Sequence, residues 1–201
     1  FARALSNARP CLAPLLDRAR HGGLVGEEFL LTLQTLDATL AVRDVLVKQE
    51  GSPLLRSHAE RLTAGGDALG RQIRRTIDER GEVRDDASQE LADLIRKRRT
   101  VEARVETKLR ALLERNPEIV SEPMITRRRG RLVVPVKSGT IGMADYVIHD
   151  RSATGQTLYA EPTWLVPENN VLAELVDAIR DEIRRILREL TGAFLESEAA
   201  L

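Results

Sequence analysis

The sequence predicts a mainly α-helical protein, with a helical core, a long antiparallel helix pair and a small antiparallel β insert at the tip of that pair. Aromatic residues make up only 3% of the 201 residues, a composition that suits long helices better than a sheet sandwich. Apolar residues recur every three or four positions in residues 91–112 and again in 172–194, the pattern of helices that pack lengthwise. Between these segments, residues 122–164 contain short β-branched runs punctuated by proline.

The first 80 residues are predicted to form a cluster of short helices. One helical stretch ends at Gly22, and a longer one covers Glu27–Lys48, where leucines recur at helical spacing. Ser52, followed by proline, predicts the start of another helix. We interpret the apolar faces of these helices as packing surfaces.

Residues 86–121 predict the first long helix. Its apolar positions are Leu91, Leu94, Val101, Val105, Leu109 and Leu112. The spacing is broken at Arg98, where the next apolar residue is due. Asp86 stands three residues before Gln89, which is a capping-box spacing. Pro117 predicts the end of the helix just before it, because the residue preceding a proline is disfavoured in helical conformation.

Residues 122–166 predict the β insert. The strand candidates are Met124–Arg128, Leu132–Val136, Tyr146–Ile148 and Thr157–Tyr159. Arg129 and Gly130 suit a tight turn that joins the first two strands as a hairpin. The last two are separated by the polar loop Asp150–Gly155. We expect a sheet of three or four antiparallel strands.

Residues 167–201 predict the returning helix. Its apolar positions are Leu172, Val176, Ile179, Ile183, Ile186, Leu190 and Phe194. Acidic residues near its start and arginines towards its end suit the helix dipole. Because the insert separates the two long helices, their apolar seams can face each other in antiparallel packing.

Charge is unevenly distributed along a chain that is neutral overall. Residues 96–137 carry 13 lysines and arginines against 5 acids, and the remainder carries 18 against 26. A cluster of guanidinium groups suits a phosphate backbone. The candidate nucleic-acid-binding residues are Arg127, Arg128, Arg129, Arg131 and Lys137 at the hairpin, and Arg96, Lys97 and Arg99 on the helix. Alternatively, these helix residues pair with acids of the returning helix. The absence of interleaved aromatic residues argues against reading of single-stranded bases.

Several chemistries find no support in the sequence. Cys11 is the only cysteine, so no internal disulfide is possible and a reducing cytoplasm is expected. No apolar run reaches the ~20 residues of a membrane span, no two histidines lie at metal-ligand spacing, and no phosphate-binding loop motif is present. His149 and Asp150 are neighbours that should point to opposite faces of a strand, so with Ser152 we expect a structural turn rather than a triad. Because the first residue is Phe1, we expect the chain to be part of a longer protein.

Four runs of the sequence resemble the MutS-II family, bacterial MutS paralogues that typically carry a C-terminal Smr nuclease domain. They are Ile125–Lys137, the His-Asp-x-Ser-x-x-Gly-x-Thr-x-x-x-Glu-Pro motif of His149–Pro162, the pair Asn169–Asn170, and Asp78–Leu91. The sequence departs from the family at Ala160, where isoleucine is favoured, and at Gln89, where proline is favoured. The segment after Lys137 is also shorter.

The resemblance implies a division of the chain into four parts. Residues 1–85 would be the core domain, 86–121 the outgoing lever helix, 122–166 a clamp-like insert and 167–201 the returning lever helix. It further implies a homodimeric parent with an ATPase that uses ATP and Mg²⁺ and an Smr endonuclease domain. This chain would then be a non-catalytic module without a cofactor of its own.

The function expected from the residues and the resemblance together is sequence-independent contact with the backbone of duplex or structured DNA. The module would also transmit ATP-driven motion, in a parent that acts in recombination control or DNA repair. Two alternatives remain open at this point. The arm could contact ribosomal RNA in ribosome rescue, since charge alone does not separate the two nucleic acids. It could also be a dimerisation scaffold without a nucleic-acid contact.

Overall fold

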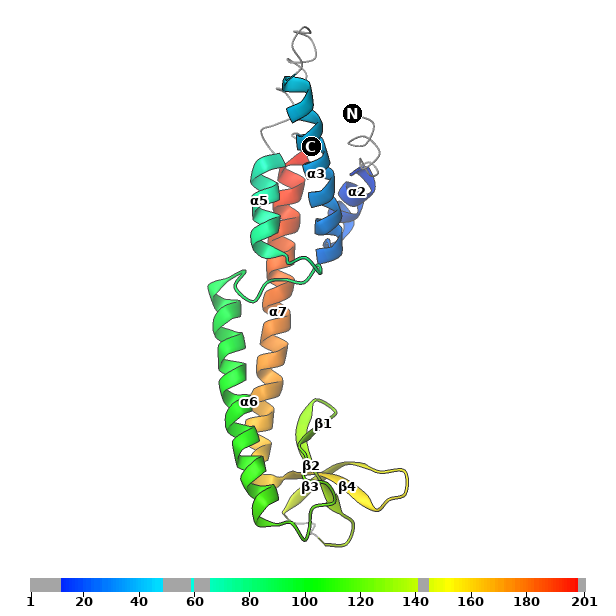
Figure 1. The fold of residues 1–201 in the computed structure, drawn as a ribbon, viewed down its shortest axis with the longest axis vertical. Helices are drawn as coiled ribbons and strands as arrows, with labels where there is room; N and C mark the ends of the chain where they lie inside the picture. The colour runs from blue at the N-terminus through cyan, green and yellow to red at the C-terminus, as the bar shows by residue number, and fades with distance from the viewer. Residues whose placement is uncertain (1–11, 49–58, 60–65, 141–144, 199–201) are drawn as a thin grey trace. The chain divides into compact units, whose positions relative to one another are not determined.

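The computed structural model describes residues 12–48, 59, 66–140 and 145–198, and the chain divides into two compact units (Figure 1). The first unit comprises Phe1–Ala92 and Asp181–Leu201, and the second comprises Asp93–Arg180. The fold is mainly α with one small antiparallel sheet, as the sequence predicts. Two long helices, α6 (Gln89–Arg115) and α7 (Val166–Glu196), contribute residues to both units.

The first unit is built from α2 (Ala13–His21), α3 (Gly26–Val47), α5 (Gly66–Thr76) and the C-terminal part of α7. Its core contains the fully buried side chains of Phe29, Ile73 and Phe194. The predicted helix ending at Gly22 and the predicted helix over residues 27–48 are confirmed. The helix predicted to begin at Ser52 lies outside the described residues.

The start of α3 packs tightly against the turn that follows α5. A Cβ atom added to Gly26 would lie 1.8 Å from the carbonyl oxygen of Gly81. That turn is held by the carboxylate of Asp78, which accepts hydrogen bonds of 2.9 Å from the backbone N–H groups of Arg80 and Glu82. The bonds from Glu82 and Arg80 hold the pKa of Asp78 below its ordinary value. Glycine is therefore required where α3 meets this turn.

The N-terminus of α6 is capped differently from the sequence expectation. The Oγ of Ser88 accepts a 3.0 Å hydrogen bond from the backbone N–H of Leu91, so Ser88 rather than Asp86 is the capping residue. The same hydroxyl donates to Oε1 of the buried Glu182, 2.6 Å away. The prediction from Asp86 and Gln89 was wrong because a serine two residues later offers the same cap with a buried acceptor. The end of α6 at Arg115 lies where Pro117 predicts it.

The sheet of the second unit has the strand order β1-β2-β4-β3, with every neighbouring pair antiparallel. Its strands are β1 (Thr126–Arg128), β2 (Arg131–Lys137), β3 (Tyr146–Arg151) and β4 (Thr157–Pro162). The predicted hairpin is confirmed: Arg129 (φ 51°) and Gly130 (φ 80°) form its turn, as a type I′ connection requires. β3 runs on to Arg151, so the loop before β4 is shorter than the sequence suggests.

The core of the second unit lies between the sheet and the facing sides of α6 and α7. It contains Val101, Val105, Leu109 and Leu113 from α6, Leu172 and Leu175 from α7, and Leu132, Val134, Val136, Leu158 and Ala160 from the sheet. Most of the predicted apolar positions on α6 are buried, but Leu113 is more deeply buried than Leu112. Val176, expected in the seam of α7, is instead 39% exposed. Because the sheet also packs against both helices, the most buried residues of each helix do not lie on a single seam between the two helices.

Candidate nucleic-acid interface

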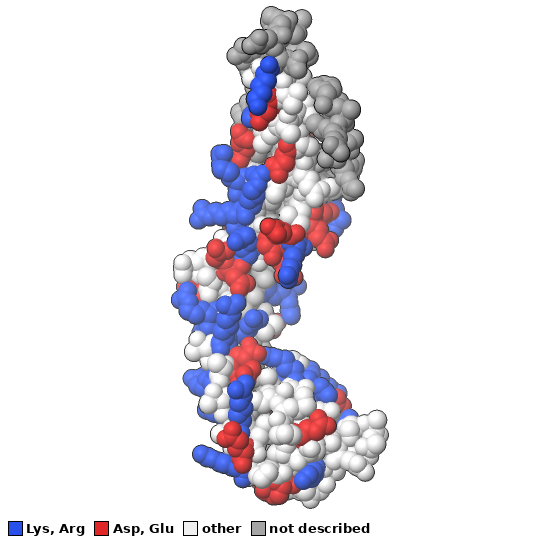
Figure 2. Space-filling model, viewed as in Figure 1, with Lys and Arg blue, Asp and Glu red and all other residues white. Residues whose placement is uncertain are grey.

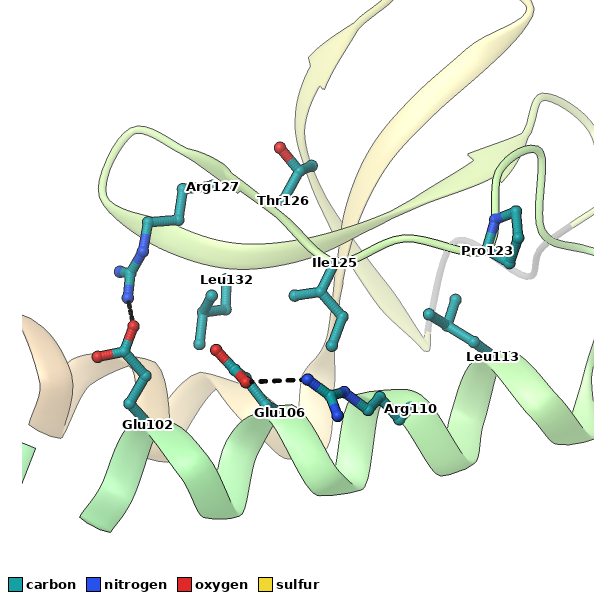
Figure 3. A pocket seen from close by; sticks show the side chains of 9 residues that line it. All are labelled: Glu102, Glu106, Arg110, Leu113, Pro123, Ile125, Thr126, Arg127 and Leu132. Atoms are coloured by element: carbon teal, nitrogen blue, oxygen red, sulfur yellow. Dashed lines mark hydrogen bonds and ion pairs between the residues drawn. The ribbon is translucent and has the colours of Figure 1, made fainter. Parts of the chain in front are cut away.

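The first two hairpin arginines are held by contacts within the second unit. Arg127 forms an ion pair with Glu102 of α6, beside a pocket of about 490 Å³ between α6 and the hairpin (Figure 3). The guanidinium of Arg128 lies 3.8 Å from the ring centroid of Tyr159, a cation–π contact. Its Nε also lies 3.3 Å from Oδ2 of Asp150. Arg127 therefore holds the hairpin against α6, and Arg128 holds it against β3 and β4.

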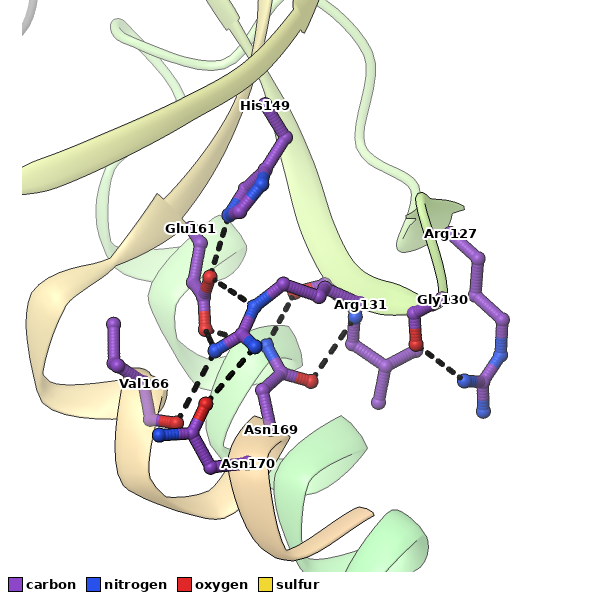
Figure 4. A network of polar contacts seen from close by, with 9 residues as sticks. Arg127, Gly130, Arg131, His149, Glu161, Val166, Asn169 and Asn170 are labelled. Carbon is purple, nitrogen blue, oxygen red and sulfur yellow. Dashed lines mark hydrogen bonds and ion pairs between the residues drawn. The ribbon is translucent and has the colours of Figure 1, made fainter. Parts of the chain in front are cut away.

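Arg131 belongs to a buried polar network centred on Glu161 (Figure 4). Its Nε donates to Oε2 of Glu161 at 2.7 Å, and its Nη2 donates to Oε1 at 2.8 Å. Nη1 donates to Oδ1 of Asn170 at 2.9 Å. Glu161 is only 1% exposed. The planar guanidinium thus satisfies a carboxylate that burial alone would make costly.

Two further side chains complete the network. His149 Nε2 lies 2.5 Å from Oε2 of Glu161, and the amide of Asn169 donates to Oε1 at 2.8 Å. Asn169 also bonds the backbone N–H and carbonyl of Leu132, at 3.1 and 3.0 Å. Burial would raise the pKa of Glu161, but the hydrogen bonds from Arg131, Asn169 and His149 and the charge of Arg131 hold it below its ordinary value. The network ties β2, β3 and β4 to the start of α7.

His149 and Asp150 point to different partners, as expected from their adjacency. His149 reaches Glu161, whereas Asp150 lies beside Arg128 and accepts a 2.8 Å hydrogen bond from the backbone N–H of Arg151. A register shift between β3 and β4 occurs at this point. Ser152 accepts a 3.1 Å hydrogen bond from the backbone N–H of Thr157 and so closes the turn. These residues act in the structure of the loop.

A line of four exposed cations follows the outer surface of α6. Lys97, Arg104, Lys108 and Arg115 are spaced by seven, four and seven residues. At about 3.6 residues per turn they fall within about 20° of one line along the helix. We call these four residues the α6 basic line. Figure 2 shows lysines and arginines over this helix, with acidic side chains among them.

The members of the α6 basic line differ in what holds them. Within the described part of the chain, the side chains of Lys97, Arg104 and Arg115 form no hydrogen bond or ion pair. Lys108 donates to Glu168 at 2.5 Å and lies 5.8 Å from the ring centroid of Trp164. The hydrogen bond from Lys108, with the charges of Lys108 and Arg104 adding to it, holds the pKa of Glu168 below its ordinary value.

The remaining candidate residues are scattered around this line. Arg96 forms an ion pair with Asp93 at 2.8 Å, and it lies about 100° from the α6 basic line, with Arg99 still farther round the helix. Lys137 donates to the carbonyl oxygen of Glu118 at 2.9 Å. Arg129 is exposed at the hairpin turn, and none of the described residues forms a hydrogen bond or ion pair with it.

Of the eight sequence candidates, only Lys97 therefore lies on the α6 basic line. Sequence reasoning missed Arg104, Lys108 and Arg115, because it followed runs of consecutive arginines. Their spacing of seven, four and seven residues was the available signal.

Among the described residues, no group of three histidine, cysteine, aspartate or glutamate side chains is arranged to hold a metal ion. None of the helices described has the length and apolar character needed to cross a membrane.

Comparison with curated proteins finds relatives named as MutS2 endonucleases. The chain is 36% identical over 179 residues to "Endonuclease MutS2" of Symbiobacterium thermophilum, covering 88% of this chain and 22% of that protein. It is 36% identical over 193 residues to the Geobacillus sp. protein of the same name, covering 92% and 24%. Its identity to the Aquifex aeolicus protein of that name is 32% over 183 residues, which cover 88% of this chain and 24% of that protein. No family model matches the chain.

Proposed function

This chain belongs to the MutS2 family, spanning 22–24% of the length of the relatives compared, and we propose that it is a non-catalytic module that contacts the phosphate backbone of duplex or structured DNA. The relatives are named as endonucleases, and an enzyme that cleaves a nucleic acid must first hold it. In the parent protein, ATP hydrolysis and cleavage would belong to other segments. This segment would serve as core, lever and clamp-like insert.

The observation that carries this proposal is the α6 basic line. Lys97, Arg104 and Arg115 are exposed and keep their charge uncompensated by a hydrogen-bonded carboxylate within the described residues. The line spans 19 residues, and the 18 steps between its ends make about 27 Å of helix. Cations in a row at this spacing suit the regular negative charge of a duplex. Contacts to phosphates carry no sequence information, so this binding should be independent of sequence.

The hairpin has a different part in this proposal. Arg127, Arg128 and Arg131 hold the insert together through Glu102, Tyr159 and Glu161. Withdrawing Arg131 would leave the buried Glu161 without its strongest partner, which is costly. Arg129 at the turn is the hairpin cation best able to reach a phosphate.

Binding of duplex DNA to the full chain tests the proposal. The variant Lys97→Ala/Arg104→Ala/Arg115→Ala should bind about tenfold more weakly or worse, because each exposed charge contact contributes up to about 1 kcal/mol. The loss should be equal for duplexes of unrelated sequence. Fold should survive, since alanine is the best helix former. Fluorescence anisotropy with labelled duplexes at low salt measures the effect.

The control removes the same charge elsewhere. Arg71, Arg75 and Arg188 are exposed residues of the first unit, and replacing all three with alanine should change the affinity by less than twofold. If both triple variants bind alike, net charge rather than the α6 basic line governs binding. Tighter binding to structured ribosomal RNA than to any DNA would favour the ribosomal alternative. Salt-independent absence of binding with a stable dimer would favour the scaffold.

A further inference from the structure

Arg98 interrupts the apolar stripe of α6 at a position where the three- and four-residue spacing calls for an apolar side chain. It lies one helical turn after Leu94, which packs against the core of the second unit, and three residues before the buried Val101. An arginine in such a place is normally paired, because an unpaired buried charge is strongly unfavourable.

No such partner is present in the described part of the chain. The Nε of Arg98 is buried and has no hydrogen-bond acceptor. No ion pair of its guanidinium is formed with any described residue either. By contrast, the neighbouring Arg127 pairs with Glu102, and Arg131 pairs with Glu161. Only the Nε is buried and the Arg98 side chain as a whole is half-buried, so its two Nη groups remain open to water or to a bound anion.

Arg98 lines a pocket that could admit one. The pocket has a volume of about 240 Å³ and is bounded by Arg98 and Glu102 of α6, Arg127 and Gly130 of the hairpin, and Leu172 and Val176 of α7. Two arginines and one glutamate leave a net positive charge, and Glu102 is already neutralised by Arg127 (Figure 3). The apolar walls supplied by α7 lower the local dielectric and strengthen the attraction for an anion.

We propose that this pocket is an oxyanion site, in which a phosphate group accepts hydrogen bonds from the guanidinium of Arg98 and is shared with Arg127. The fork of an arginine matches two phosphate oxygens. On the α7 side, Leu172 and Val176 offer no carboxylate that would compete with the phosphate, and Glu102 is paired with Arg127. The phosphate comes either free in solution or from a nucleic-acid backbone. Only the second source rests on the function proposed above.

The test follows the side-chain Nε–H resonance of Arg98 in the full chain by NMR. Inorganic phosphate is added at constant ionic strength, with chloride as the exchanged anion. The resonance should shift in a saturable manner, and the Arg98→Gln variant should show a phosphate affinity lower by about tenfold or more in neighbouring backbone resonances. Arg110→Gln is the matched control on the same helix, because Arg110 is exposed and already paired with Glu106.

A thermal measurement separates this site from a merely structural arginine. Arg98→Leu continues the apolar stripe, so its Tm in chloride buffer should be equal to or above that of the wild type. Phosphate should raise the Tm of the wild type and leave that of Arg98→Leu unchanged. An equal rise in both, or an Arg98 resonance that phosphate does not move, would overturn the proposal.

A short duplex oligonucleotide replaces phosphate in the second arm. A saturable shift of Arg98 with the duplex identifies backbone phosphate as the source, and a shift with inorganic phosphate alone identifies a free anion. The two proposals fail separately. If Lys97→Ala/Arg104→Ala/Arg115→Ala lowers duplex affinity no more than its control but the Arg98 resonance still responds to inorganic phosphate, only the α6 basic line is refuted.

Discussion

At the scale of single residues, Glu161 shows how the family motif stabilises the fold. The carboxylate is 1% exposed and accepts hydrogen bonds from Arg131, Asn169 and His149. These partners lie 30, 8 and 12 residues away in the sequence. The sequence alone indicated the motif but not which of its side chains contact Glu161, because the register of β2, β3 and β4 decides which side chains meet.

Removing the charge at this position should weaken the second unit. Glu161→Gln would leave the guanidinium of Arg131 without its carboxylate and should cost about 3 kcal/mol of unfolding free energy at pH 7. Glu114→Gln, a change at an exposed glutamate of α6, should stay within about 0.5 kcal/mol. Urea unfolding of both variants measures the difference. Equal stabilities would show that the network does not hold the insert.

The same substitution predicts a pH dependence. The hydrogen bonds and the charge of Arg131 outweigh burial and place the folded pKa of Glu161 below its ordinary value, so the folded state takes up this proton less readily than the unfolded state. The stabilisation is complete above the unfolded pKa of about 4.3 and is lost as the pH falls through the lower folded pKa. The gap in stability between the wild type and Glu161→Gln should therefore narrow below about pH 4.3. A gap that stays constant down to pH 3 would contradict this assignment.

At the scale of elements, local sequence signals were most reliable where a turn or a proline fixes the backbone. Arg129–Gly130 predicted the hairpin because a type I′ turn needs two residues with positive φ, which the structure has. Pro117 predicted the end of α6. The α6 cap was misjudged, since Asp86 and Ser88 are both suitable and only the nearby Glu182 distinguishes them. The exposure of Val176 follows from the sheet, which no spacing within α7 reveals.

The contact between α3 and the turn after α5 makes a prediction at this scale. Gly26→Ala would place Cβ 1.8 Å from the carbonyl oxygen of Gly81, so the backbone must move. We expect a loss of about 2–3 kcal/mol in unfolding free energy. Gly23→Ala is the control, because nothing lies within 4 Å of its added Cβ and its φ is not positive. Should Gly26→Ala unfold at the same temperature as Gly23→Ala, the close packing of α3 on this turn is wrong.

At the scale of the whole molecule, the sequence predicted the fold class and the MutS-II resemblance correctly, while the distribution of usable charge needed the structure. A count of lysines and arginines favours the hairpin, yet three of its four arginines are engaged with Glu102, Tyr159 and Glu161. Lys97, Arg104 and Arg115 have no hydrogen-bonded carboxylate among the described residues, and they lie on α6, where helical spacing brings them onto one line. A sequence gives the number of cations, and only the packing shows which of them a phosphate can reach.

The salt dependence of duplex binding tests the central claim most directly. Each phosphate neutralised on duplex DNA contributes a slope of about −0.9 to log affinity against log salt. With Lys97, Arg104, Arg115 and Arg129 in contact, the wild-type slope between about 50 and 200 mM salt should lie near −3 to −4. The Lys97→Ala/Arg104→Ala/Arg115→Ala variant should flatten it to about −1. A triple variant whose slope equals that of the wild type would contradict the assignment of DNA contact to α6.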